Sequence, residues 1–169
     1  MQSWKKNFFI IWLGQAVSQL SSSILQFAIV WYLTDTTGSP LVLSAAMLAG
    51  FLPNGILGPF IGVYIDHYNR KRIMILSDLG IAAVSFLLTI AGWMGEIPLS
   101  LILAVLVARS IGSAFHNPCL QAVTPQIVPS EELTKCAGYS QTLQSISQLL
   151  SPAIAAVLYS SWNLSGIIL

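Results

Sequence analysis

One charged residue stands in the middle of a long apolar stretch of this sequence. Arg109 lies within residues 99–121, and a charge at the centre of a membrane-spanning helix costs about 2.5–3.5 kcal/mol on insertion scales. Such a side chain avoids lipid, so we expect it to face a bundle interior or a watered cavity. Gly112, Ser113 and His116 follow it on one helical stripe. The alternative is a structural arginine that caps backbone carbonyls of a neighbouring broken helix.

Two other apolar stretches, 8–33 and 136–159, carry amides and hydroxyls at helical spacing. Amides in hydrocarbon need partners, so these rows face other helices or water. Simple hydrogen bonding between helices, worth about 0.6 kcal/mol per bond, is the alternative. Three helices with polar faces beside two without them favour a substrate cavity. Its predicted residues are Gln15, Gln19, Gln26, Arg109, Ser113, His116, Gln141 and Gln148.

Composition places the chain in a membrane. Of its 169 residues 55% are hydrophobic and 8% charged, whereas a soluble domain carries about 25% charged residues. Nucleic-acid binding is excluded because the largest basic patch is a single short loop, 70–72. Cys119 and Cys136 lack a CxxC spacing and have no histidine cluster beside them. We therefore predict two reduced structural thiols and no metal site.

Long apolar runs divide the chain into membrane helices, because spanning a bilayer takes about 20 residues. We predict an all-α membrane protein in which residues 1–169 form one N-terminal bundle of five helices and the start of a sixth. The loop at 123–134 is expected to be polar and irregular. The predicted helices cover residues 8–33, 41–65, 73–94, 99–121 and 136–159, and the sixth begins at 164–169.

The cations indicate the orientation of this bundle. The connections at 35–40, 95–98 and 160–163 contain no Lys or Arg. Six of the seven Lys and Arg residues precede the first helix or lie in the alternate connections, all on one side of the membrane. By the positive-inside rule the N-terminus is cytoplasmic. These six residues are Lys5, Lys6, Arg70, Lys71, Arg72 and Lys135.

The second helix and the loop after it form a candidate moving part. Pro53 and Pro59 remove backbone donors and should bend this helix. Asp78 follows the loop, and we expect it to pair with Arg70 or Arg72. The third helix is otherwise apolar, which favours a lipid-facing position. Small or short residues recur at every fourth position of the second helix, which lets another helix approach closely: Ala46, Gly50, Asn54, Gly58 and Gly62.

Residues 62–71 resemble the loop 2–3 motif of the major facilitator superfamily, G-x-x-x-D-(R/K)-x-G-(R/K)-(R/K). His67 stands where the motif has a cation, and Asn69 stands at its second glycine. Asn tolerates a left-handed backbone, which would preserve the turn. The resemblance implies a conformational gate that holds the outward-open state. Its residues would be Gly58, Gly62, Asp66, Arg70 and Lys71.

Two further stretches resemble motifs of the same superfamily. Arg109 begins a helix 4 motif, R-x-x-x-G, whose glycine comes one place early at Gly112. The helix 5 motif of antiporters, G-x8-G-x3-G-P-x2-G-G, is matched in register, with small residues in place of most glycines. Its candidate residues are Gly138, Ser147, Ser151 and Pro152, followed by Ala155 and Ala156.

The whole chain, including residues 114–118 and 133–141, is similar to the N-terminal part of bacterial macrolide efflux proteins in the drug:proton antiporter branch. The resemblance implies a secondary active transporter that exports macrolide-type drugs by proton-coupled alternating access between two six-helix halves. Its partners would be an amphipathic drug, protons, the bacterial cell membrane and a C-terminal half absent here, with no cofactor. We therefore expect an N-terminal fragment truncated in helix 6, inactive alone.

Other functions remain open at this stage. Another amphipathic drug, a siderophore or a sugar-like solute would suit the same fold, and so would a membrane interaction protein that transports nothing. An intramembrane enzyme has little support, because Asp66, His67 and Asp78 lack a recognised catalytic spacing. Helices 1, 4 and 5 carry no acidic residue at mid-depth, so Asp66, Asp78 and His116 are the titratable candidates for proton coupling.

Asp66→Asn, in the product of the complete gene that encodes this chain, should abolish efflux. A carboxylate near a helix N-terminus is stabilised by backbone N–H groups, and the amide lacks that charge. Drug efflux and the amount of protein in the membrane, measured in the same cells, check this prediction. Normal efflux by the variant would refute the gate assignment.

Overall fold

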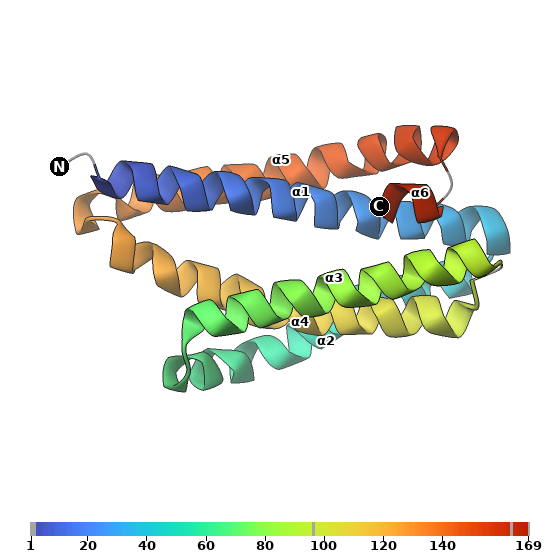
Figure 1. The fold of residues 1–169 in the computed structure, drawn as a ribbon, viewed down its shortest axis with the longest axis horizontal. Coiled ribbons are helices and arrows are strands. Elements are labelled where there is room, and N and C mark those ends of the chain that lie inside the picture. Colours follow the sequence, from blue (N-terminus) through green and yellow to red (C-terminus); the bar gives the residue numbers. More distant parts are fainter. Residues whose placement is uncertain (1–2, 96, 163, 169) are drawn as a thin grey trace.

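The described residues, 3–95, 97–162 and 164–168 in a computed structural model, form α-helices joined by short connections (Figure 1). Within these ranges the side chain of Asp66 lies outside the described part. The elements are α1 (Ser3–Thr37), α2 (Pro40–His67), α3 (Arg70–Met94), α4 (Leu99–Ile127), a 3-10 turn (Ser130–Glu132), α5 (Leu133–Ser161) and α6 (Leu164–Ile168).

Four of these helices are long and apolar enough to cross a membrane: α1, α2, α3 and α4. The sequence predicted a fifth span in α5, which has 29 residues, as α4 does. Length therefore does not separate the two helices. The rows of Gln and Ser along α5 lower its mean hydropathy, so apolarity alone does not identify it as a span.

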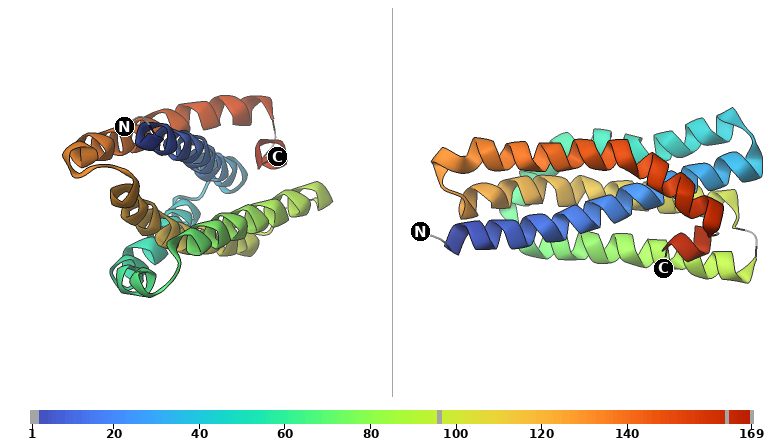
Figure 2. Two further views of the ribbon diagram at one scale, coloured as in Figure 1. Left: turned by 60° about the vertical axis from the view of Figure 1, so that its left-hand side comes forward. Right: turned by 90° about the horizontal axis from the view of Figure 1, so that it is seen from above.

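The helices pack as two groups (Figures 1 and 2). α1 and α5 run side by side, and α4 lies against both α2 and α3. The start of α1, the α2–α3 link and the α4–α5 link lie at one end of the bundle, which we call the cationic end. Lys5, Lys6, Arg70, Lys71, Arg72 and Lys135 all belong to the helix starts at this end.

Three buried clusters hold the helices together. At the cationic end Phe8, Val128 and Cys136 join α1 to the α4–α5 link. Between α2 and α4, Ile61 and Ile65 pack on Ala114 and Cys119. The largest cluster lies toward the opposite end and includes residues of all six α-helices: Leu25, Ala28, Ile29, Leu33, Ala46, Leu88, Ile97, Ile102, Val105, Leu106, Ala155 and Leu164.

α4 continues beyond its predicted end. Residues 123–127 were predicted to belong to a polar loop that contains Pro125, and proline removes a backbone donor from a helix. Hydrogen bonds on both sides of Pro125 keep this segment helical. The Thr124 hydroxyl donates to the Leu120 carbonyl at 3.2 Å, and the Val128 N–H donates to the Thr124 carbonyl at 3.1 Å.

α2 passes through Pro53 and Pro59 as one helix. Beside Pro53, the Asn54 backbone N–H donates to the Ser110 hydroxyl of α4 at 3.2 Å. The row of small residues makes its close contact at Gly50, where a Cβ would lie 2.6 Å from Nε2 of Gln26. At Gly58 and Gly62 a Cβ would meet nothing within 4 Å among the described residues.

Asn69 connects α2 to α3 without the left-handed backbone that the sequence analysis considered. Its φ is −70° and its ψ is 105°, an extended conformation. Its side-chain oxygen accepts a hydrogen bond from the Arg72 N–H at 3.3 Å. Asn is a good N-cap because it satisfies an orphan donor of the first turn. The residue that replaces the motif's glycine therefore starts α3.

α3 has two different faces. One face exposes large apolar side chains, which suits lipid: Leu76, Leu79, Phe86, Leu87 and Trp93. The other buries Ser85, Leu88 and Thr89. The prediction that α3 is apolar apart from Asp78 is therefore wrong for its buried face.

Gly112 lets α3 and α4 approach closely, since a Cβ there would lie 2.7 Å from Cγ1 of Ile81 and 3.5 Å from the Ser77 carbonyl oxygen. Gly112→Ala should lower the free energy of unfolding by roughly 1–3 kcal/mol, a usual cost of overpacking. Thermal unfolding of detergent-solubilised protein measures the change. Gly80→Ala on α3 is the matched control, because nothing lies within 4 Å of its Cβ position. Equal stability of the two variants would contradict the close approach.

Candidate transport site

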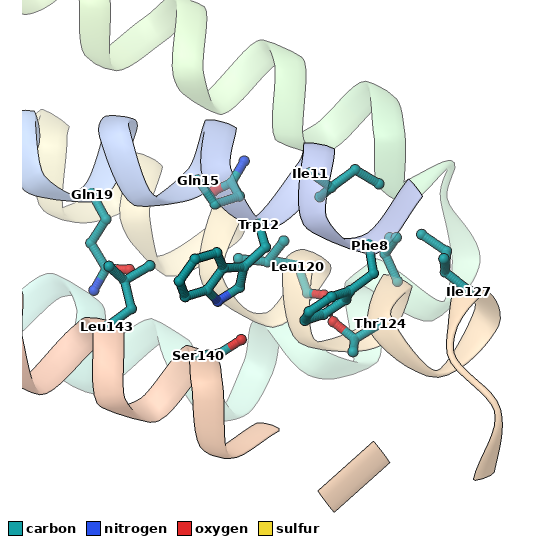
Figure 3. Close-up of a pocket in the computed structure, with 11 residues that line it drawn as sticks. Phe8, Ile11, Trp12, Gln15, Gln19, Leu120, Thr124, Ile127, Ser140 and Leu143 are labelled. Atoms are coloured by element: carbon teal, nitrogen blue, oxygen red, sulfur yellow. The ribbon is translucent and has the colours of Figure 1, made fainter. Parts of the chain in front are cut away.

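A pocket opens between α1, α4 and α5 near the cationic end (Figure 3). It encloses about 470 Å³ of space, part of it open to the surroundings. No charged side chain is among the described residues that line it. α1 contributes Phe8, Ile11, Trp12, Gln15 and Gln19, α4 contributes Leu120, Val123, Thr124 and Ile127, and α5 contributes Ser140 and Leu143.

The pocket offers one unpartnered donor. Nε1 of Trp12 is buried and has no hydrogen-bond partner among the described residues. In Figure 3 the indole lies between Gln15 and Phe8, near Ser140. The Ser140 hydroxyl donates to the Cys136 carbonyl at 3.2 Å. A buried donor without a partner costs about 1–3 kcal/mol, so a movement of Trp12 that let its nitrogen meet an acceptor would recover this cost.

Of the predicted cavity residues, only Gln15 and Gln19 line this pocket. Gln141 and Gln148 are exposed on α5, where Ser140 and Leu143 face the pocket instead. Ser113 is half-buried on α4, outside the lining. For the residues of α4, the rotation of the helix explains the difference, because Arg109 and His116 face α3 and the pocket lies beside a different part of the helix.

The pocket residues that the sequence analysis missed follow ordinary helical spacing. Phe8, Trp12, Gln15 and Gln19 lie on one face of α1, and only the two glutamines belong to its row of amides and hydroxyls. On α4 the lining continues from Leu120 to Ile127. Part of that segment was predicted to be a loop, in which side chains share no helical face.

Arg109 ties three helices together. It is 7% exposed, and its Nη1 donates to the Ser85 hydroxyl of α3. Its Nη2 donates to the Ser22 carbonyl of α1 at 3.2 Å. Nε has no partner among the described residues. Arg109 therefore caps a backbone carbonyl, as in the structural alternative, although α1 is continuous at Ser22.

His116 lies opposite Asp78. Nε2 of the imidazole is 3.4 Å from Oδ1 of the carboxylate, but their geometry does not make a hydrogen bond. Arg70, which we expected beside Asp78, donates from Nη1 to the Ala122 carbonyl at 3.2 Å. The structure thus places Asp78 against α4 and not, as predicted, against Arg70 or Arg72.

The remaining predicted gate residues are spread along one edge of the bundle. Gly62 and Lys71 are exposed, and Gly58 and Arg70 are half-buried. Arg70 links the start of α3 to α4 through Ala122. The Asp66 side chain, the central residue of the predicted gate, lies outside the described part.

The small residues of α5 face α1. Ser147, Ser151 and Ala155 recur at every fourth position and are fully buried. The Trp31 indole N–H of α1 donates to the Pro152 carbonyl at 3.4 Å. Ser and Ala thus occupy a helix contact where the antiporter motif has glycine. Gly138 lies apart from this contact, and a Cβ there would meet nothing within 4 Å among the described residues.

Comparison with known proteins finds extensive similarity to one group. The chain is 58% identical over 166 residues to macrolide efflux protein A of Streptococcus pyogenes, which covers 98% of the chain and 41% of that protein. It is 57% identical over 131 residues to macrolide efflux protein A of Enterococcus faecalis, covering 78% of the chain and 40% of that protein. An uncharacterized MFS-type transporter of Bacillus subtilis, YkuC, is 27% identical over 165 residues, 97% of the chain and 38% of the relative.

The similarity to the streptococcal protein falls on its N-terminal part, so the chain spans about two fifths of that relative's length. No solved structure matches the chain. Residues 11–169 match the family model of the Major Facilitator Superfamily, a family of transporters and not a class of enzyme. With its long apolar helices, the chain is a multi-pass membrane protein that belongs to the Major Facilitator Superfamily.

Proposed function

We propose that this chain forms the N-terminal half of a secondary active transporter that exports macrolide-type drugs in exchange for protons. The observation that carries the proposal is 58% identity over 98% of the chain to a macrolide efflux protein. Such a transporter works by alternating access, in which two halves rock about a shared site. The second half would come from residues outside this chain.

The pocket between α1, α4 and α5 is the part of the drug site that we expect this half of the transporter to contribute. Aromatic and aliphatic walls suit an amphipathic molecule, because most ligand pockets are apolar with a few polar groups that fix orientation. Trp12 supplies a donor, and Gln15 and Gln19 supply amides. The described lining holds no carboxylate, so an amine on the drug must find its counter-charge elsewhere.

Orientation follows from the cationic end. Excess Lys and Arg mark the cytoplasmic side of bacterial membrane proteins, and the N-terminus lies at that end of the bundle. The pocket then faces the cytoplasmic half of the cell membrane, the side from which an exporter collects its substrate. Gly58, Gly62, Asp66, Arg70 and Lys71 border the same side, where they would act as the gate between the halves.

Cells that express the complete gene should tolerate a severalfold higher macrolide concentration than cells with an empty vector. A protonophore should remove this difference, since it removes the proton gradient that drives export. Growth inhibition and accumulation of labelled macrolide, each measured with and without the protonophore, check the prediction. Unrelated amphipathic drugs tested in parallel define the range of cargo.

Unchanged macrolide tolerance, with the protein present in the membrane, would remove macrolides from the proposal. Resistance to a different amphipathic compound in the same cells would then identify another cargo for the same transporter. Protection that persists with the protonophore would contradict proton coupling while leaving export intact.

Arg109→Ala should abolish export, because the guanidinium joins α1 and α3 through two separate acceptors. Ser85→Ala is the matched control, since it removes one acceptor and leaves the bond to the Ser22 carbonyl. We expect it to keep most of the export. Macrolide accumulation and protein level in the membrane distinguish lost activity from lost protein. Full export by Arg109→Ala would assign this arginine a dispensable structural role.

A further inference from the structure

The contact between α3 and α4 contains a polar seam in consistent antiparallel register. Ser85 faces Arg109, and one step along, the backbone of α3 at Ser77 and the Ile81 side chain close on Gly112. Asp78 faces His116 at the next step. Because Gly112 has no Cβ, the two helices lie close enough for an imidazole on one to meet a carboxylate on the other.

The histidine and the carboxylate differ in how exposed their side chains are. The His116 side chain is 10% exposed and the Asp78 side chain is 46% exposed. Nε2 of His116 is buried without a hydrogen-bond partner among the described residues, yet it lies 3.4 Å from Oδ1 of Asp78. A buried ring nitrogen without a partner, this close to a partly exposed carboxylate, is a place where an added proton would gain an ion-pair partner.

Other titratable groups near this point are few. On α3, Arg70 reaches α4 at Ala122, farther toward the cationic end. On α2, the Tyr64 ring packs edge-on against Phe115, with centroids 6.0 Å apart, and the helix ends with Asp66, whose side chain is outside the described part, and His67, which is exposed. On α4 itself Arg109 points to Ser85 and Ser22, and the thiol of Cys119 is buried among Ile61 and Ile65 of α2.

The elements on the far side of α4 add no charge at this point within the described residues. α1 presents the uncharged Gln15 and Gln19 to the pocket. At the start of α5, Lys135 pairs with Glu132 at 4.0 Å. Asp78 is therefore the charged group that the structure places within ion-pair distance of His116.

We propose that His116 and Asp78 form a proton-binding pair of the transporter, an inference that rests on the proposed export function. A hydronium ion transfers a proton to the ring of neutral His116, so that one N–H bond forms, one O–H bond of the hydronium breaks and a water molecule is left. The pair then changes from a single negative charge to a neutral imidazolium–carboxylate ion pair, and no other bond forms or breaks. In a low-dielectric seam this change alters how strongly α3 is held to α4.

The pair lies between the candidate gate and the drug pocket, along the same contact of α3 with α4. Toward the cationic end the same two helices meet at Arg70, a residue of the candidate gate. In the other direction they meet at Arg109, which also holds α1, a wall of the pocket. Proton binding at the pair can thus bias the gate and the drug pocket through one helix contact.

The test measures drug binding and proton release separately in the purified, detergent-solubilised product of the complete gene. Labelled macrolide measures binding, and an indicator dye in weakly buffered solution measures protons released when macrolide is added. The wild type should bind and release protons. His116→Gln and Asp78→Asn should bind within a fewfold of wild type and release almost none. Glu131→Gln, which removes an exposed carboxylate near the cationic end, should bind macrolide and release protons as the wild type does.

Proton release retained by either binding-competent variant would overturn the pair. So would a wild type that binds macrolide without releasing protons. Loss of binding in both variants, with Glu131→Gln still active, would show a structural or substrate-contact role and also overturn it. A wild type that binds no macrolide refutes the proposed cargo at the first measurement, and the inference fails with it.

Discussion

A guanidinium inside a bundle of apolar helices is stable only where oxygens of the protein replace its water. Arg109 meets this requirement with acceptors from two neighbours, the Ser85 hydroxyl and the Ser22 carbonyl. The constraint fixes α1 and α3 relative to α4, because moving either α1 or α3 away would remove one of the two acceptors of the buried charge. The pocket, the α3–α4 seam and the α1–α5 contact are all arranged around helices held in this way.

Small side chains at the helix contacts also hold the bundle together, because they let neighbouring helices pack closely. Gly112 permits the close approach of α3, and Gly50 permits the Gln26 side chain to lie on α2. Ser147, Ser151 and Ala155 serve the same purpose between α5 and α1. In a membrane, where hydrophobicity does not drive helices together, contact depends on such packing and on polar pairs. The open positions at Gly58 and Gly62 contrast with these filled contacts.

The polar residues that the sequence grouped in one cavity lie in two different places in the structure. Gln15 and Gln19 face a pocket with aromatic walls, whereas Arg109 and His116 face α3 and take part in helix contacts. The described lining of the pocket therefore holds no charged side chain. If the proposed function holds, coupling between the pocket and these groups would pass through helix packing, since α4 contributes to both the pocket and the seam.

The sequence by itself determined the class of protein, because low charge and long apolar runs leave no alternative to membrane helices. It also determined that the cations share one end, and its motifs indicated the family that the comparison established. The rotation of each helix was decided only by the tertiary structure. Spacing along one helix shows which side chains share a face, but not which neighbour that face meets. For this reason Asp78 lies beside His116 and not, as predicted, beside Arg70. The end of α4 stays helical across Pro125 through hydrogen bonds at Thr124, and it forms a wall of the pocket.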